Sequence, residues 1–137
     1  MTVAPGTTSR RVVVTAAVIE REDAFLLTRR PSGVHLEGYW EFPGGKCEPG
    51  ESHVASLERE IAEELEAGIV VGPEVFTVSH AYPDRVIELH FFDCQLVGEP
   101  RAVLGQEMRW VPREELRSLT FPPADEELIE RLAGGGT

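Results

Sequence analysis

The feature that most constrains this chain is a group of like charges in a segment with helical periodicity. Apolar residues recur between Val54 and Leu65 at intervals of three and four, which predicts a helix with one apolar face. Beside that face, Glu60, Glu63 and Glu64 fall within about 100° of arc. Carboxylates this close repel each other, and the repulsion grows where the face is covered. A divalent cation would remove it, and all-oxygen ligation suits Mg²⁺ or Mn²⁺.

A glutamate-rich helix is often only a solvated surface, but the loop before this helix favours a site. Gly44-Gly45 follows a short aromatic segment, so a backbone carbonyl there can approach a metal without steric hindrance. Glu51 lies where the helix begins. Arg59 adjoins the carboxylates and can hold one by charge-assisted hydrogen bonds. The loop and the helix together therefore predict a metal centre.

The rest of the chain interleaves strands with helices, which is typical of an α/β or α+β layered domain. At 137 residues the chain is long enough for one domain and too short for two, with mobile ends expected at 1–10 and 133–137. Ser52 is expected to cap the helix that runs to Leu65. The remaining elements are predicted as strands over 11–20, 24–30 (its hairpin partner), 39–42, 69–71, 75–80, 86–96 and 107–111, a break at 43–45, a helical turn at 112–116 and a closing helix at 125–132.

Charge and composition exclude several classes of partner. The net charge is −11, from 13 basic and 24 acidic residues, which argues against nucleic acid and against an anionic membrane surface. The longest apolar stretch, 12–19, is too short to span a bilayer, and the first ten residues lack a secretory signal. Cys47 and Cys94 have no metal-ligand spacing and read as reduced thiols, so we expect a cytoplasmic protein. An anionic ligand would need a bound metal as mediator.

The glutamate helix and its loop form a longer pattern. Residues 45–67 read GKCEPGESHVASLEREIAEELEA and resemble the Nudix box, G-x5-E-x7-R-E-U-x-E-E-x-G-U, in which U is aliphatic. One position departs, because Glu66 stands where the family has the glycine that ends the helix. Gly68 can end it two residues later, so we expect a slightly extended helix. The resemblance implies an α/β/α sandwich around a mixed sheet, and hydrolysis of a nucleoside diphosphate linked to another moiety.

The resemblance also implies roles for the matching residues. Glu60 and Glu64 resemble the main ligands of Mg²⁺, for which Mn²⁺ is a possible substitute; Glu63 resembles a further ligand, and the Gly45 carbonyl a backbone ligand. Glu51 would steady the site together with Arg59. An acid after the box often completes such sites. Glu107 matches that acid in this chain. Relatives can place it a few residues earlier, where this chain has the apolar Val103 and Leu104. The general base stays open between Glu63 and Glu107.

Beyond the box, about residues 11–132 resemble the MutT-type nucleotide pyrophosphohydrolases. The segments that carry this resemblance are LLTRRP, EGYWEFPGGK, YPDR, VGEP and FPPAD, in that order. It implies phosphate contacts from Arg30, His35 and Lys46. Phe42 and Arg85 would line the base pocket, and Asp125 would read the base edge. Each has a plain alternative as a surface charge, a loop residue, a core residue or the N-cap of the closing helix.

Asp125 bears on the choice of base. The 8-oxo-dGTP-selective enzymes have asparagine at the matching position, which both donates and accepts, whereas an ionised aspartate only accepts. A carboxylate suits the cytosine amino group or the protonated N7 of an oxidised guanine. We expect the chain to hydrolyse nucleoside triphosphates, as a monomer or a homodimer. The alternatives are an ADP-ribose or dinucleoside polyphosphate pyrophosphatase, for which Pro83 has the spacing, and a non-catalytic nucleotide-sensing module.

Overall fold

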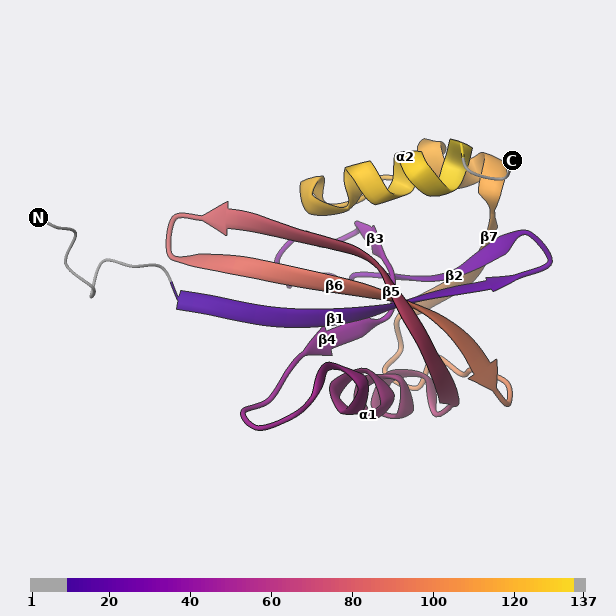
Figure 1. Ribbon diagram of the computed structural model, residues 1–137. Helices are drawn as coiled ribbons and strands as arrows, with labels where there is room; N and C mark the ends of the chain where they lie inside the picture. The colour runs from indigo at the N-terminus through magenta and orange to yellow at the C-terminus, as the bar shows by residue number, and fades with distance from the viewer. Residues whose placement is uncertain (1–9, 135–137) are drawn as a thin grey trace, which may run out of the picture.

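The fold is a mixed sheet between two helices (Figure 1), seen in a computed structural model that describes residues 10–134. Most of the ends predicted to be mobile lie outside this range. Of the residues assigned to those ends, Arg10 instead belongs to the first strand, and residues 133–134 to the last helix. No helix among the described residues is long and apolar enough to cross a membrane.

The sheet has the strand order β3-β2-β1-β6-β5, with β4 paired to β1 and β7 paired to β2. Its strands are β1 (Arg10–Arg21), β2 (Ala24–Arg29), β3 (Trp40–Glu41), β4 (Gly44–Lys46), β5 (Gly68–Tyr82), β6 (Arg85–Val97) and β7 (Glu107–Pro112). The helices are α1 (His53–Leu65) and α2 (Glu126–Gly134), with short 3-10 turns η2 (Arg113–Ser118) and η3 (Pro123–Asp125).

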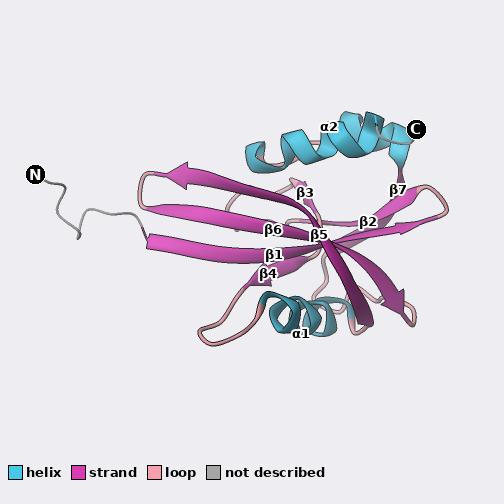
Figure 2. Cartoon of the chain, viewed as in Figure 1, coloured by secondary structure: helices cyan, strands magenta, loops and turns pink. Residues whose placement is uncertain are grey.

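Alternation along the central strand β1 supplies both faces of the sheet. Ala16 and Val18 join the apolar cluster that α2 covers, whereas Ala17 and Ile19 join the cluster that α1 covers. Figure 2 shows the two helices on opposite sides of the strands. The expected α/β/α sandwich around a mixed sheet is therefore confirmed.

The predicted hairpin of β1 and β2 is present, but it is short. Strand β1 runs parallel to β6 over ten residue pairs, from Arg10 opposite Arg85 to Ile19 opposite Cys94. Only its last two residues pair with β2. The same edge of β1 is occupied earlier by β4, where Thr15 lies opposite Gly45, so β2 can join only after β4 ends.

Cys47 and Cys94 are both free thiols.

Two predicted breaks are in fact strand. Gly44 and Gly45, predicted as part of a break at 43–45, form β4 together with Lys46, because pairing with β1 supplies the hydrogen bonds that the local sequence does not favour. The segments 69–71 and 75–80 belong to one strand, β5, which passes through Gly72 and Pro73 with register shifts on either side of Glu74. Such a bulge accommodates a proline within an edge strand.

Helix α1 begins at its predicted cap and ends at Leu65, as the apolar spacing predicts. The hydroxyl of the N-cap Ser52 accepts a hydrogen bond from the backbone N–H of Ala55. The expected extension toward Gly68 is wrong, because the helix stops at Leu65 and Glu66 itself adopts the left-handed conformation, with φ 54° and ψ 38°. Ala67 is buried and β5 starts one residue later, so the chain must turn at Glu66.

Candidate functional site

The site begins where α1 crosses β4. At Gly45, an ideal Cβ would lie 2.6 Å from Oε2 of Glu60, so any larger residue would displace that carboxylate. Pairing with Thr15 of β1 fixes Gly45 in the sheet. The glycine of the motif is thus required by the close approach of the glutamate helix to the strand.

Arg59 binds the acids at one end of the site, which are Glu51, Glu60 and Glu63. Its Nε and Nη2 donate to Glu51 at 2.6 Å and 3.0 Å, and Nη1 donates to Glu60 at 3.0 Å and to Glu63 at 3.3 Å. Nη2 also donates to the carbonyl of Lys46 at 3.0 Å. The hydrogen bonds from Arg59 and from the Glu48 backbone lower the pKa of Glu51 to about 2. The predicted partnership of Glu51 with Arg59 is therefore present in the structure.

Glu64 lies in the opposite situation. Burial, the charges of Glu41, Glu60 and Glu63, and a hydrogen bond with Glu60 together raise the pKa of Glu64 to about 8. No basic side chain among residues 10–134 forms an ion pair with it. The other end of the site thus holds more negative charge than the chain itself neutralises.

The sequence analysis missed Glu41, which joins two parts of the site. Glu41 lies on β3 and receives a hydrogen bond of 3.0 Å from Nη1 of Arg30. Its charge raises the pKa of Glu64 and also that of Asp125, so it lies within electrostatic range of both. The local sequence shows Glu41 only as a lone acid between Trp40 and Phe42, which does not indicate Glu64 or Asp125 as a neighbour.

Asp125 is nearly enclosed, with 4% of its surface exposed. It is the last residue of η3, which runs directly into α2, so Asp125 lies inside a helical turn and not at the flanking N-cap position considered from the sequence. Burial and the charge of Glu41 raise the pKa of Asp125 to about 7. At neutral pH both protonation states are therefore populated.

Three of the other predicted binding residues lie near these acids or near one another. The Nε of Arg30 donates to the carbonyl of His35 at 2.6 Å. The ring of His35 meets that of Tyr82 edge-on at 5.6 Å, and the guanidinium of Arg85 lies 5.1 Å from the centre of the same ring. Arg30 and Arg85 thus both lie next to the pair formed by His35 and Tyr82, and Arg30 also reaches Glu41.

Two predicted binding residues are placed less clearly. Phe42 is 4% exposed and packs against Phe91 and Phe121 at centroid distances of 5.8 Å and 6.1 Å, as the core alternative predicts. Lys46 is exposed at the end of β4, and its carbonyl is bound to Arg59.

The acid predicted to complete the metal site is paired with an arginine. Glu107 accepts from Nη1 of Arg29 at 3.3 Å and is not among the charges that raise the pKa of Glu64. The loop before β7 instead lies against the end of α1. There, the N–H of Val103 and Nε2 of Gln106 donate to the carbonyl of Glu64 at 3.4 Å and 3.3 Å.

The acids of α1 suit a hard divalent cation by their chemistry. All are oxygen donors, and Gly45 leaves room for Glu60 beside the strand. Within the described part of the chain, no three His, Cys, Asp or Glu side chains already converge on one point. Glu60 and Glu63 both face Arg59. Glu60 thus contacts both Arg59 and Glu64, so an ion held between these carboxylates would compete with Arg59 for Glu60.

Fold and site together define a class of enzymes in which a helix bearing glutamates crosses a glycine strand on a sandwiched mixed sheet. The family model described as the NUDIX domain matches residues 14–131. The chain belongs to the Nudix family of hydrolases, whose members generally use divalent metal ions.

The similarity to curated proteins extends over most of the chain. It is 37% identical to the CTP pyrophosphohydrolase of Escherichia coli over 88% of this chain and 90% of the relative. It is 36% identical to the 8-oxo-dGTP diphosphatase of Haemophilus influenzae over 90% of this chain and 93% of the relative. The MutT protein of Methanosarcina mazei superposes with a TM-score of 0.80 at 27% identity, over 90% of this chain and 94% of that one. These similarities support activity as a nucleotide pyrophosphohydrolase.

Proposed function

We propose that this enzyme hydrolyses nucleoside and deoxynucleoside triphosphates, cytosine and oxidised-guanine nucleotides among them, to the monophosphate and pyrophosphate with Mg²⁺. The observation that carries the proposal is the row of acids from Glu60 through Glu64 and Glu41 to Asp125. One end of the row suits a cation that binds a polyphosphate, and the other end is a nearly enclosed acid suited to a base edge. The names of the two curated relatives support the same substrates.

Glu60, Glu64 and Glu63 would hold the Mg²⁺, with the Gly45 carbonyl as a backbone ligand. When bound, Mg²⁺ neutralises charge on phosphoryl oxygens and lowers the pKa of a bound water. Arg59 holds Glu51 and the side of Glu60, so the ligand face keeps its place on β4. The general base would be Glu107, or Glu63 where Glu60 and Glu64 alone hold the ion; 58% of the Glu63 side chain is exposed.

Arg30, His35 and Lys46 would supply the phosphate contacts that a chain of net charge −11 otherwise lacks, and Arg85 would line the base pocket. The guanidinium donors of Arg30 suit phosphate oxygens. Arg30 also neutralises part of the charge of Glu41. A triphosphate would therefore meet the metal at α1 and the guanidinium of Arg30, which directly follows β2.

Asp125 would read the base in two forms. Its ionised carboxylate only accepts hydrogen bonds, as suits an amino group such as that of cytosine. Its protonated form also donates, as an asparagine does. Because the pKa of Asp125 is raised to about 7, both forms are available at neutral pH, and the enzyme would accept more than one base.

The test is a panel of canonical and oxidised nucleoside triphosphates, ADP-ribose and dinucleoside polyphosphates, with products resolved by phosphorus NMR in isotope-labelled water. The proposal expects a nucleoside monophosphate and pyrophosphate from the triphosphates, only with Mg²⁺ or Mn²⁺. Faster turnover of ADP-ribose or of a dinucleoside polyphosphate would contradict it. Release of inorganic phosphate as the first product would also contradict it.

A pair of variants ties the activity to the site. Glu64→Gln should abolish most turnover, whereas Glu58→Gln, the same change at an exposed position of the same helix, should leave it unchanged. Equal activity in the two variants would remove the basis of the proposal.

A further inference from the structure

A second group of titratable side chains lies apart from the acids of the site. It joins α1, β5 and β6 through His53, Glu74, Glu88 and His90. His90 is 8% exposed, and both of its ring nitrogens contact carboxylates. Its Nδ1 lies 2.6 Å from Oε2 of Glu74, and its Nε2 lies 2.6 Å from Oε2 of Glu88.

Two carboxylate acceptors, one at each ring nitrogen, require a ring with two N–H groups. A neutral imidazole has one, and the imidazolium has two. Burial opposes the charged ring, but the hydrogen bonds and charges of Glu74 and Glu88 outweigh burial and raise the pKa of His90 above 6.5. The contacts hold the pKa of both Glu74 and Glu88 below the ordinary value.

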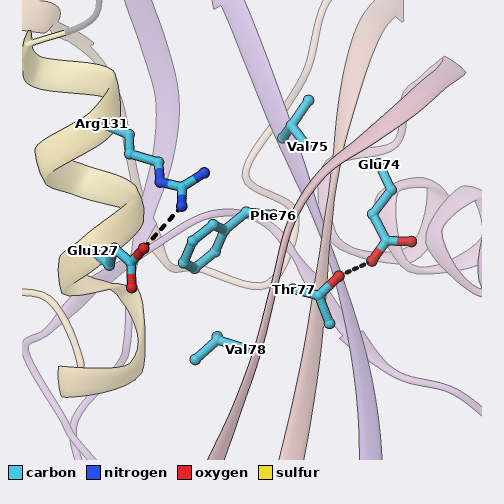
Figure 3. A pocket seen from close by; sticks show the side chains of 7 residues that line it. All are labelled: Glu74, Val75, Phe76, Thr77, Val78, Glu127 and Arg131. Atoms are coloured by element: carbon cyan, nitrogen blue, oxygen red, sulfur yellow. Dashed lines mark hydrogen bonds and ion pairs between the residues drawn. The ribbon is translucent and has the colours of Figure 1, made fainter.

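The bulge in β5 places Glu74 in this group. Glu74 lies between two register shifts, opposite Phe92, which faces α1. Figure 3 shows Glu74 and Thr77 to one side of β5 and Phe76 and Val78 to the other, and all four belong to the lining of a groove of about 560 Å³ between β5 and α2. The hydroxyl of Thr77 donates to Glu74 on that side.

Every element packed against His90 contributes to its surroundings. From β5 come Glu74 and the hydroxyl of Thr77, and from β6 Glu88, which also receives a hydrogen bond from Arg11 of β1. From α1 comes the ring of His53, whose centre lies 4.3 Å from that of His90. The charged ring therefore has two acids, one arginine and one further histidine around it.

The same contacts attach the start of α1 to the sheet. His53 is the first residue of α1, and three residues later Ser56 Oγ lies 3.3 Å from Oγ1 of Thr15. Thr15 pairs in turn with Gly45. Glu60 lies seven residues after His53, about 10 Å further along a rigid helix, so the position of the first turn sets where Glu60 meets β4.

We propose that the protonated ring of His90 is a clasp that holds β5, β6 and the first turn of α1 together, and so positions the glutamates of α1. Loss of one ring proton to solvent leaves one of the two carboxylates without its donor and loosens the clasp. His90 is thus a positioning residue, and its effect on catalysis rests on the proposed function. The stabilisation is complete below pH 6.5 and is lost as the pH rises through the higher pKa of His90 in the folded protein.

The first test needs no activity. Nitrogen-detected NMR of the histidine rings at about pH 7 should show two N–H groups on His90, because both ring nitrogens face carboxylates. In Glu88→Gln the titration midpoint of His90 should fall by about one pH unit, since one opposite charge is lost. A ring with a single N–H at that pH, or an unchanged midpoint in a folded variant, would overturn the clasp.

The second test follows stability and turnover with pH. The Tm of the wild type should exceed that of His90→Gln at about pH 6, and the difference should shrink by about pH 9, because glutamine does not titrate. The matched control His80→Gln, on β5 but on the α2 side beside Tyr82, should show no such convergence. A pH-independent difference for His90→Gln would contradict a proton-operated clasp.

Kinetics separate the clasp from the proposed function. His90→Gln should lower kcat more than it changes KM at the lower pH, and approach the wild type at the higher pH. If no nucleotide is hydrolysed but the NMR and Tm results hold, the proposed function alone fails. If hydrolysis is normal and His90 carries one proton, the clasp alone fails.

Discussion

Glu51 and Glu64 lie at the two ends of one motif and differ in what surrounds them. Glu51 receives two hydrogen bonds from Arg59, and its pKa falls to about 2. Glu64 faces burial and other acids, and its pKa rises to about 8. The negative charge of Glu51 is neutralised within the chain, by Arg59. The negative charge around Glu64 is neutralised only by a cation from outside the chain, and such local conflict is typical of functional sites.

The largest effect expected from this comparison is that of Glu64→Gln. Loss of groups that only orient a metal's ligands costs 10- to 100-fold, so loss of a ligand should lower kcat by more than about 100-fold. The fold should survive, which circular dichroism would check. Near-normal turnover with Mg²⁺ in this variant would remove Glu64 from the ligand set.

In the absence of metal, the same variant should remove the loss of stability that Glu64 causes as the pH rises. Because the pKa of Glu64 rises from 4.5 to about 8 on folding, the wild type loses stability as the pH increases between these values. Glu64→Gln lacks this loss, so its Tm relative to the wild type should increase across that range. A constant difference would show that Glu64 is not strained in the folded chain.

At the other end of the motif, Glu51→Gln should destabilise the protein. Its pKa is lowered on folding, so its contribution is present above about pH 4.5 and disappears as the pH falls toward 2. Urea unfolding of the variant and the wild type should therefore differ at neutral pH and converge in acid. If the two differ equally at all pH values, Arg59 does not act through the charge of Glu51.

A smaller effect is expected on base choice. The ratio of kcat/KM for cytosine and oxidised-guanine triphosphates should change in the wild type as the pH crosses about 7, because Asp125 titrates there. In Asp125→Asn the ratio should differ from that of the wild type and stay constant with pH. A ratio unaffected by the substitution would leave Asp125 without a role in base recognition.

The smallest effect concerns the end of the same helix. Glu66 adopts a left-handed conformation, which costs a residue with a side chain roughly 1 kcal/mol. Its ion pair with Arg101 is exposed and worth little. Glu66→Gly should therefore raise the free energy of unfolding by up to about 1 kcal/mol in urea titrations, whereas Glu58→Gly inside α1 should lower it by about the same amount. A destabilised Glu66→Gly would mean that the side chain of Glu66 contributes more than its backbone strain costs.

The sequence predicted the elements that depend on periodicity and local chemistry. The apolar spacing of α1, the Ser52 cap and the β-branched run of β1 each specify structure within one segment, and all are present. The contacts between Arg59 and Glu51 were also predictable, because the motif places the two residues on one side of the site.

Features that arise from pairing between distant segments were not predictable in this way. Strand β4 exists because β1 pairs with it, and the bulge in β5 joins two segments that Gly72 and Pro73 separate in the sequence. Glu41 enters the site because β3 lies beside β2, and nothing in its local sequence indicates Glu64 as a neighbour. The left-handed Glu66 follows from where β5 must start.

The most direct test of the central claim is a Mg²⁺ titration followed by Tm at about pH 7.5, above the ordinary pKa of a carboxyl group. A ligand that binds only the folded state raises its stability, so Mg²⁺ should raise the Tm of the wild type and of Glu58→Gln, and leave that of Glu64→Gln nearly unchanged. An equal rise in all three proteins, or none in the wild type, would contradict the claim that the excess charge around Glu64 is built to receive a cation.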